Sequence, residues 1–279
     1  MFTIAHAIQQ SNTLAEADTA RLDIELLLAF VLNKDRAYLY TWPERELSLE
    51  QQAEFEALLK RRQCGEPMAH IVGEKEFWSL PFKVNDSTLI PRPETELLVE
   101  CILARYPDTG IRIVDLGTGT GAIICALARE RPHWHCLGVE KNKEALELAK
   151  INGESLHLSN IQWQLSDWFE QLDSAVLFNV IVSNPPYVDE SDLHLLQGDV
   201  RFEPASALVA ANKGLADLEH IIQHAPHYLY NQGLLLVEHG CQQGQAVAAL
   251  LDDQGFIDIF TAKDLAGLAR VTGGIWQKG

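Results

Sequence analysis

The chain is poor in basic residues. It carries 22 Lys and Arg against 39 Asp and Glu, which gives its 279 residues a formal net charge of −17. Sequence-independent affinity for nucleic acids comes largely from Lys and Arg side chains that neutralise phosphates. The one basic cluster, Lys60 to Arg62, is read more simply as the charged last turn of a helix. We therefore expect no stable binding to nucleic acids.

Cysteine is scarce as well, and it follows no regular pattern. The five cysteines are odd in number, scattered, and without a C-x-x-C spacing that would indicate a disulfide framework or a zinc site. In the segment HWHC, His135 and Cys136 are neighbours at a strand start and would point to opposite faces, so they would not share a metal. The sequence predicts reduced thiols, a cytoplasmic protein and no bound metal.

Long apolar runs are absent too. The longest one extends from Leu26 to Leu32, well short of the roughly 20 residues that a membrane helix needs. The first residues, MFTIAHAIQQ, have neither the basic region nor the long apolar region of a signal peptide. A content of 47% hydrophobic and 22% charged residues is ordinary for a globular protein. We expect no membrane segment and no targeting segment.

Helical periodicity dominates residues 1–72. The segment RLDIELLLAFVL has apolar residues at helical spacing. Ser48 and Gln51 have the spacing of a capping box, and Gly65 stands where a helix-terminating glycine belongs. The sequence predicts a small N-terminal helical bundle, which we interpret as a domain that recognises a folded protein substrate.

Strand signals begin after this region. Residues 73–93 have aromatic and β-branched residues around a break at Ser79 to Pro81, which predicts a β-hairpin linker. Over residues 94–279, strands alternate with helices, as in a doubly wound sheet. The seven expected strands are IRIVDL, HCLGVE, IQWQLS, FNVIVS, GLLLVEH, FIDIFTA and ARVTGGIW. The predicted fold class is α/β: a Rossmann-like seven-stranded domain, its last two strands a hairpin-like pair, preceded by the helical bundle.

A glycine-rich turn follows the first of these strands. In IRIVDLGTGTGAIICALA, an apolar strand ends in an acid and leads through Gly117, Gly119 and Gly121 into an apolar helix. Glycines let the backbone approach a ligand closely, and a helix N-terminus presents free N–H groups. The turn therefore predicts a site for a nucleotide-like cofactor. The same residues also satisfy the G-x-G-x-x-A fingerprint of dinucleotide binding.

Glu140 ends the next strand, 23 residues after Gly117. At this position a carboxylate can accept hydrogen bonds from both hydroxyls of a ribose. Charge-assisted bonds of this kind contribute roughly 1.5–3 kcal/mol each. An NAD-dependent dehydrogenase would place an acid here equally well. Glu140 is thus a candidate ribose ligand, whichever cofactor is bound.

The tetrapeptide NPPY directly follows the fourth strand. The carboxyl ends of the strands face the ligand crevice in a doubly wound sheet, so Asn184 to Tyr187 are placed where chemistry occurs. The prolines remove N–H donors, which leaves the Pro185 carbonyl free to accept a hydrogen bond from substrate. Asn184 supplies a carboxamide, and Tyr187 a flat face. This set would hold a planar –NH2 group and aim its nitrogen at a methyl donor.

Methyl transfer to a conjugated nitrogen is therefore the interpretation we favour. A hydride-transfer enzyme has no use for NPPY, which argues against the dehydrogenase. The NPPY pocket alone does not distinguish a glutamine amide from the exocyclic amine of adenine, cytosine or guanine. The net charge of −17 favours glutamine, because a protein this acidic has little with which to contact phosphates.

The sequence resembles the protein-(glutamine-N5) methyltransferases that act on peptide chain release factors, the HemK/PrmC family. The resemblance runs through nearly the whole chain, over DIELLLAFVL, EPMAHIVGEKEFW, LIPRPETELLVE, DLGTGTGAI, SNPPY and QGDVRFEPASALVA. LIPRPETE together with GTGTG and NPPY is a specific combination. NPPY alone is also similar to motifs of adenine-DNA and guanine-RNA methyltransferases. In this family the acid after the second strand is usually aspartate, whereas here it is Glu140.

The resemblance implies S-adenosyl-L-methionine as cofactor, the Gly-Gly-Gln loop of class 1 release factors as substrate, and a role for each matching residue. The residues that would bind the cofactor are Gly117, Thr118, Gly119, Thr120, Gly121, Glu140, Asp167, Trp168 and Asn184. The residues that would hold the glutamine amide are Asn184, Pro185, Pro186 and Tyr187, with Asn184, Pro185 and Tyr187 catalytic. Trp168 is also readable as a core aromatic. Arg92, Glu94 and Glu96 are expected to order the loop over the site or simply to form a linker and an acidic first helical turn.

Overall fold

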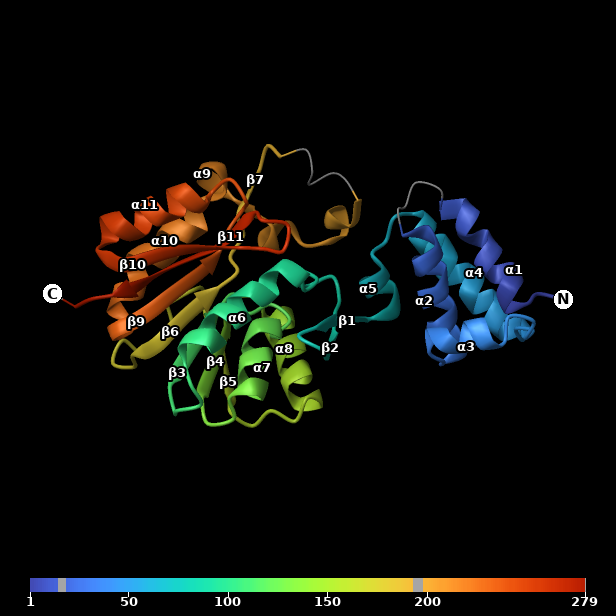
Figure 1. Cartoon of the computed structure of the whole chain (residues 1–279), viewed down its shortest axis with the longest axis horizontal. Helices are drawn as coiled ribbons and strands as arrows, with labels where there is room; N and C mark the ends of the chain where they lie inside the picture. The colour runs from blue at the N-terminus through green and yellow to red at the C-terminus, as the bar shows by residue number, and fades with distance from the viewer. Residues whose placement is uncertain (15–18, 193–197, 279) are drawn as a thin grey trace. The chain divides into compact units, whose positions relative to one another are not determined.

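The chain folds into two units (Figure 1) in the computed structural model, which describes residues 1–14, 19–192 and 198–278. One unit is Met1–Gly73 with the short helix η4 (Gly198–Phe202). The other consists of the described residues of 74–192 and 203–278. No helix in these described parts of the chain is long and apolar enough to cross a membrane.

The N-terminal unit is a bundle of helices. Its elements are α1 (Ile4–Gln9), η1 (Gln10–Leu14), α2 (Ala20–Leu32), α3 (Arg36–Thr41), α4 (Leu49–Gln63) and α5 (Met68–Val72). The predicted capping box is present: Ser48 Oγ accepts the Gln51 N–H at 3.1 Å, and Gln51 Oε1 accepts the Ser48 N–H at 3.0 Å. Gly65 follows the end of α4 with φ of +87°, which glycine adopts without steric cost. Both predictions are confirmed.

Apolar burial and one ion network hold this bundle together. Ile24 and Phe55 are fully buried in its core. The buried Glu25 carboxylate accepts hydrogen bonds from Arg36 Nη2 at 2.6 Å and from Tyr40 Oη at 2.6 Å. Burial acts to raise the pKa of Glu25, but these hydrogen bonds and that of Arg21 outweigh it and lower the pKa. Glu25 therefore stays ionised and joins α2 to α3.

A seven-stranded sheet forms the centre of the second unit. Its strands are β3 (Arg112–Leu116), β4 (His135–Glu140), β5 (Ile161–Leu165), β6 (Phe178–Ser183), β9 (Leu229–Glu238), β10 (Phe256–Lys263) and β11 (Ala269–Trp276). Their order is β10-β11-β9-β6-β3-β4-β5 (Figure 1). Strands β9, β6, β3, β4 and β5 are parallel, whereas β11 is antiparallel to both of its neighbours. Each of the strands predicted from the sequence is confirmed, as is the α/β fold class.

Helices cover both faces of this sheet. They are α6 (Glu96–Arg105), α7 (Ala122–Glu130), α8 (Lys143–Ser155), α9 (Ala211–Gly214), α10 (Ala216–His224) and α11 (Gly244–Gln254). Successive residues of a strand point to opposite faces, so Ile113 packs in the cluster that contains α6 and α7. Its neighbour Val114 packs in the cluster that contains α10 and α11. The strands β3, β4, β6 and β9 are largely buried on both faces, which explains their near-continuous apolar runs.

Short elements complete this unit. They are the hairpin strands β1 (Glu74–Phe77) and β2 (Leu80–Lys83), the pair β7 (Val188–Asp189) and β8 (Val209–Ala210), and the 3-10 helices η2 (Pro93–Thr95), η5 (Ala205–Ala207) and η6 (Ala225–His227). The hairpin turns at Trp78 and Ser79, both with positive φ (54° and 57°), as in the primed two-residue turns that match strand twist.

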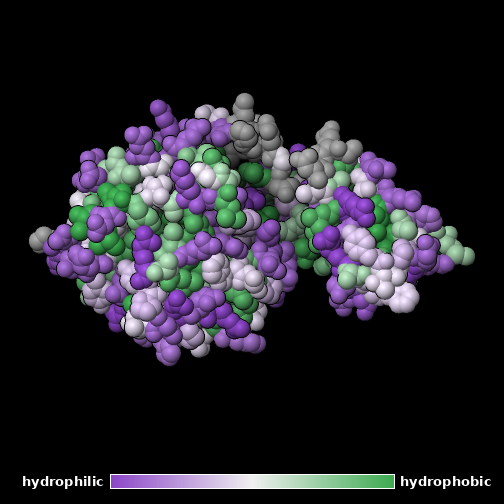
Figure 2. All heavy atoms as spheres, in the orientation of Figure 1, coloured by the Kyte–Doolittle hydropathy of each residue, from purple (hydrophilic) through white to green (hydrophobic). Residues whose placement is uncertain are grey.

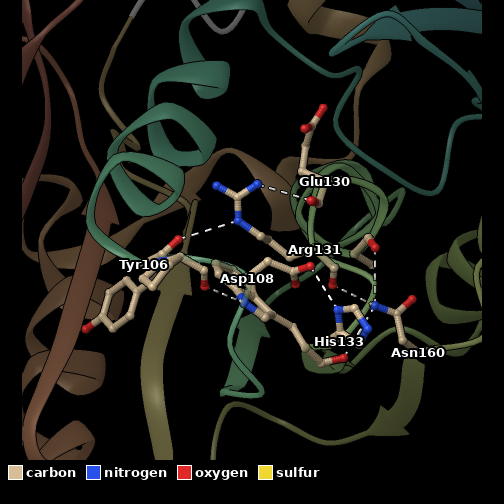
Figure 3. A network of polar contacts seen from close by, with 9 residues as sticks. Tyr106, Asp108, Glu130, Arg131, His133 and Asn160 are labelled. Atoms are coloured by element: carbon tan, nitrogen blue, oxygen red, sulfur yellow. Dashed lines mark hydrogen bonds and ion pairs between the residues drawn. The ribbon is translucent and has the colours of Figure 1, made fainter.

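A polar network closes the amino-terminal ends of β4 and β5 (Figure 3). Asn160 Nδ2 donates to the carbonyls of Ala128, Arg131 and Trp134 at 3.2–3.3 Å. His133 Nδ1 lies 2.9 Å from the Asp108 carboxylate in the same view. Among the residues that the structure describes, no group of three or more His, Cys, Asp or Glu side chains could hold a metal ion. This network satisfies backbone carbonyls and leaves the opposite edge of the sheet for ligands.

Asn152 connects the hairpin to the glycine turn. Its side chain is fully buried in α8. Oδ1 accepts the Lys83 N–H at 2.8 Å, while Nδ2 donates to the Lys83 carbonyl at 3.0 Å and to the Thr120 carbonyl at 2.9 Å. One carboxamide thus satisfies three backbone groups and holds β2 against the loop that follows β3.

Replacing Asn152 with alanine should lower the free energy of unfolding by at least about 2 kcal/mol. The change leaves three backbone groups without their partner, and each buried unsatisfied group costs roughly 1–3 kcal/mol. Chemical denaturation measures this directly. Asn12→Ala, at an exposed asparagine, is the matched control and should leave stability near the parent value. Equal stabilities for the two variants would contradict the role of Asn152.

Candidate functional site

One pocket opens at the carboxyl-terminal edge of the sheet. It is lined by the loops after β3, β4, β5 and β6, by segment 87–95 and by η5. Its empty volume, open mouth included, is about 930 Å³. The predicted site residues among its lining are Gly117, Thr118, Gly119, Thr120, Glu140, Asp167, Trp168, Asn184 and Pro186. Gly121, Pro185 and Tyr187 do not line it; they lie beside it in the same loops.

The glycine turn needs its glycines for conformation and for space. Gly117, Gly119 and Gly121 have φ of 70°, 55° and 81°, all in the left-handed region that side chains disfavour. A Cβ on Gly117 would also come within 3.2 Å of the Trp168 ring. Gly121 is the N-cap of α7, whose first N–H groups lie at the pocket. The turn therefore presents bare backbone to a ligand.

Asp115 is the last residue but one of β3 and lies beneath this turn. Its carboxyl group is completely buried, and Oδ2 accepts a hydrogen bond from Thr118 Oγ1 at 2.5 Å. Burial raises the pKa of Asp115 to about 7, although the Thr118 bond opposes the shift. Oδ1 has no hydrogen-bond partner among the described residues. Asp115 thus ties the turn to the strand from below rather than facing the pocket.

Glu140 reaches the pocket from the end of β4. Its Oε2 accepts the Gly119 N–H at 3.0 Å, and its Oε1 accepts the Asn142 N–H at 2.9 Å. Each carboxylate oxygen can accept a second hydrogen bond. The carboxylate is therefore held rigidly by backbone and keeps a free lone pair on each oxygen for two adjacent hydroxyls.

Trp168 forms a wall of the pocket. Its backbone has φ of 46°, and Ser166 Oγ donates to its carbonyl at 3.0 Å. Lys141 Nζ lies 5.8 Å from the ring centroid of the indole. These contacts hold an aromatic face beside Gly117, where a planar base would stack. Asp167 precedes it and also lines the pocket.

The NPPY segment leaves β6 at the pocket. Asn184 Nδ2 donates to Thr95 Oγ1 at 3.2 Å. Tyr187 Oη donates to Glu238 Oε1 at 3.1 Å, and its carbonyl accepts from Gln243 Nε2 at 3.1 Å. Burial raises the pKa of Tyr187 well above its ordinary value, so the hydroxyl stays protonated. The Tyr187 hydroxyl is thus turned toward β9, not toward the open pocket.

The segment before α6 covers the pocket and is tied down by Glu203. Arg92 forms an ion pair with the buried Glu203 carboxylate. Glu203 Oε2 also accepts the Ile90 N–H at 3.2 Å. Of the two other acids expected to order this loop, Glu96 accepts the Trp78 N–H at 2.7 Å, and Glu94 is exposed. Ile90 and Arg92 of LIPRPETE therefore both contact Glu203 of FEP.

Three residues of this region escaped the sequence reasoning: Thr95, Glu203 and Glu238. Thr95 lines the pocket between the two acids of PETE. Glu238 is the last residue of β9, and strand ends at this edge of a doubly wound sheet face the ligand. This position at the end of a strand could have indicated Glu238 as a site residue. Glu203 lies in an irregular segment, where periodicity has nothing to indicate.

Family models match most of the chain. Residues 7–73 match the PrmC N-terminal domain, and residues 107–274 match a methyltransferase domain. The release factor glutamine methyltransferase of Shewanella oneidensis is 50% identical over 98% of this chain and 96% of its own length. That of Vibrio cholerae is 52% identical (97% and 93%), and that of Escherichia coli 49% (94% and 94%).

Solved structures show the same fold. A methyltransferase from Pyrococcus furiosus is similar with a TM-score of 0.55 and 16% identity, over 80% of this chain and 98% of that one. The 16S rRNA N2 G1207 methyltransferase of T. thermophilus, in complex with AdoMet and guanosine, has a TM-score of 0.54 and 19% identity, over 74% and 50% of the two chains. At these identities the likeness concerns the fold alone.

Proposed function

The chain belongs to the release factor glutamine methyltransferase family, and on this premise we propose that it transfers a methyl group from S-adenosyl-L-methionine to the side-chain amide nitrogen, N5, of a protein glutamine. The observation that carries the proposal is that Asn184 lines the same pocket as the glycine turn and Glu140. A planar amide held by Asn184 and a cofactor held by the turn would share one cavity. The acceptor we propose is the glutamine of the Gly-Gly-Gln loop in class 1 peptide chain release factors.

The pocket fits S-adenosyl-L-methionine on its own features. Glu140 keeps one lone pair on each oxygen for the two ribose hydroxyls, and Trp168 offers a flat wall for adenine. The bare backbone at Gly117 leaves room that a side chain would fill. When bound, this cofactor supplies an electrophilic methyl group on a sulfonium.

The residues of the chain act by positioning. Asn184 Oδ1, in the pocket, and the Pro185 carbonyl, beside it, accept hydrogen bonds from the two N–H groups of the acceptor amide. These bonds aim the amide nitrogen along the line of transfer. Holding two reactants in this way lowers the activation barrier by roughly 7–11 kcal/mol. The amide nitrogen is a poor nucleophile because its lone pair is delocalised, so loss of a proton accompanies or follows the transfer.

The helical domain predicted over residues 1–72, which lies within the N-terminal unit, is proposed to recognise the protein substrate. On α2, Leu22, Leu26 and Phe30 are 38%, 36% and 46% exposed and stand four residues apart, on one helix face. Figure 2 shows hydrophilic residues over much of the visible surface, with apolar ones between them. An exposed apolar stripe on a chain with a net charge of −17 suits a folded protein better than nucleic acid. Because release factors are partners in translation, we place the protein in the cytoplasm.

Offering purified enzyme equal amounts of release factor, its Gly-Gly-Gln Gln→Ala variant, DNA and RNA with methyl-labelled cofactor tests this function. We expect label in the release factor only, because the amide is absent from the variant and the net charge of −17 opposes contact with phosphates. Scintillation counting and mass spectrometry of the Gly-Gly-Gln peptide give the measurement. Label in the nucleic acids, or equal label in the loop variant, would favour the rival function of an amino-methyltransferase of adenine or guanine. Calorimetry with NAD, which we expect not to bind, tests the dehydrogenase.

A further inference from the structure

The orientation of the Asn184 carboxamide is a requirement of the proposed function that NPPY itself does not meet. The two ends of a carboxamide have nearly the same shape, but one accepts hydrogen bonds and the other donates them. Only Oδ1 can accept an N–H from the acceptor amide. A carboxamide turned by 180° would present Nδ2 to the acceptor and repel its N–H. Something outside NPPY must therefore hold Nδ2 away from the acceptor.

Thr95 is the partner of that donor end. Its Oγ1 accepts the Asn184 Nδ2–H at 3.2 Å, and the side chain is buried at the edge of the pocket. A hydroxyl can also donate. If Thr95 gave its own proton to Asn184, it would bind Oδ1 and favour the turned carboxamide. The direction of the Thr95 hydroxyl therefore decides which end of Asn184 faces the acceptor.

Glu238 lies behind Thr95 and controls that direction. Its side chain is buried at the end of β9, 1% exposed, and Oε1 accepts a hydrogen bond from Tyr187 Oη at 3.1 Å. Oε2 has no hydrogen-bond partner among the described residues, and the Thr95 hydroxyl is near enough to act on the carboxyl and lower its pKa. An ionised carboxylate only accepts hydrogen bonds. Thr95 must then direct its proton to Glu238, which leaves only lone pairs for Asn184. The chain Glu238, Thr95, Asn184 has one allowed direction when Glu238 is charged.

We propose that Thr95 and Glu238 are positioning residues for methyl transfer, which set the Asn184 carboxamide with Oδ1 toward the acceptor nitrogen. This inference rests on the proposed function. Neither residue touches the reacting atoms in this arrangement. Their effect passes through Asn184, so it belongs to kcat rather than to cofactor affinity.

The arrangement makes turnover depend on pH. Burial raises the pKa of Glu238 to about 7, while the hydroxyls of Thr95 and Tyr187 act to lower it. A protonated Glu238 can donate to Thr95 and so releases the constraint on Asn184. The kcat for methyl transfer should therefore fall as pH drops through about 7, and it should have its full value above that pH.

Other charged and titratable groups surround Glu238. Arg270 of β11 lowers the pKa of Glu238, and the Glu94 carboxylate raises it. The pKa of Arg270 is itself raised by Asp264, so its guanidinium stays charged. Burial lowers the pKa of His239, which keeps that imidazole neutral, and Tyr187 stays protonated. Arg270, His239 and Tyr187 therefore do not account for the expected fall in kcat near pH 7, which we call the acid limb of the pH profile. Asp115, with a pKa raised to about 7 as well, requires a control.

The test uses the full-length enzyme, labelled cofactor and release factor, with kcat measured at saturating concentrations across roughly pH 6 to 9. Thr95→Val removes the hydroxyl at constant shape, Thr95→Ser keeps it, and Glu238→Gln replaces the obligate acceptor with a group that can donate. Glu100→Gln, an exposed carboxylate on α6, is the matched control. Thermal unfolding and calorimetry with cofactor establish that each variant folds and binds.

We expect Thr95→Val and Glu238→Gln to lower kcat above pH 7 about tenfold, the usual effect of one lost hydrogen bond, with KM and cofactor affinity near parent values. Both variants should lose the acid limb. Thr95→Ser should restore kcat, and Asp115→Asn should keep the limb. If both variants have the kcat and pH profile of the parent, the positioning role of Thr95 and Glu238 is overturned. The proposed function still stands in that case, because the parent enzyme methylates release factor. Persistence of the limb in Glu238→Gln and its loss in Asp115→Asn would also overturn it. A parent enzyme that methylates no release factor would overturn both proposals.

Discussion

Replacing Asn184 with alanine should lower kcat for methyl transfer by on the order of 100- to 1000-fold, as removal of one preorganised catalytic hydrogen-bonding group commonly does. Asn184 is the group that accepts an N–H from the acceptor amide in the proposed geometry. The cofactor contacts of Glu140 and the glycine turn remain in the variant, so cofactor affinity should stay within a small factor of the parent value. Single-turnover kinetics with labelled cofactor and release factor measure the first quantity, and calorimetry the second.

The matched control is Asn179→Ala, at the other end of β6. Asn179 Oδ1 accepts the Arg112 N–H at 2.9 Å, away from the pocket. Its loss should cost some stability and leave kcat nearly unchanged. Near-parent methylation by Asn184→Ala would refute the role assigned to NPPY. A large parallel loss of cofactor affinity would instead assign Asn184 to the cofactor rather than to the acceptor.

Replacing Glu140 with alanine should weaken cofactor binding about 100-fold or more. Two charge-assisted hydrogen bonds to the ribose hydroxyls, at roughly 1.5–3 kcal/mol each, would be lost. The variant also frees the N–H groups of Gly119 and Asn142 that the carboxylate now holds, which loosens the turn. Calorimetric titration with S-adenosyl-L-methionine gives the affinity.

Glu144→Ala is the control for this measurement, because Glu144 is an exposed acid in the first turn of α8 and does not line the pocket. It should bind cofactor as the parent does. Glu140→Asp keeps a carboxylate at the end of β4 and should retain much of the affinity. An unchanged affinity in Glu140→Ala would remove Glu140 from the cofactor site.

Most of the fold could be predicted from the sequence because its signals are local. The strands β3, β4, β6 and β9 contain apolar runs that are largely buried on both faces, whereas β5 and β10 alternate apolar with polar residues and are partly exposed. The capping box at Ser48 needs only the residues Ser48 to Gln51. The glycine turn, Glu140 and NPPY each follow directly after a strand, and parallel strands place their carboxyl ends at one edge. Adjacency along the chain was enough to place these residues around one pocket.

Other features depend on residues far apart in the chain. Asn184 meets Thr95 across 89 positions, and Arg92 meets Glu203 across 111. The carboxamide of Asn152 joins β2 to the glycine turn, although its sequence context is an ordinary helix. No periodicity or spacing indicates such pairs, because each depends on the packing of whole elements against one another.

The sequence by itself determined which elements form, which residues end them, and that an amide-binding motif stands next to a cofactor turn, since these follow from local backbone preference and apolar periodicity. Only the tertiary structure decided the surroundings of the polar groups. Burial raises the pKa of Glu238 to about 7 and places it behind Thr95. A carboxylate has the same chemistry everywhere in a sequence, and its folded environment alone sets its charge and the direction of its hydrogen bonds.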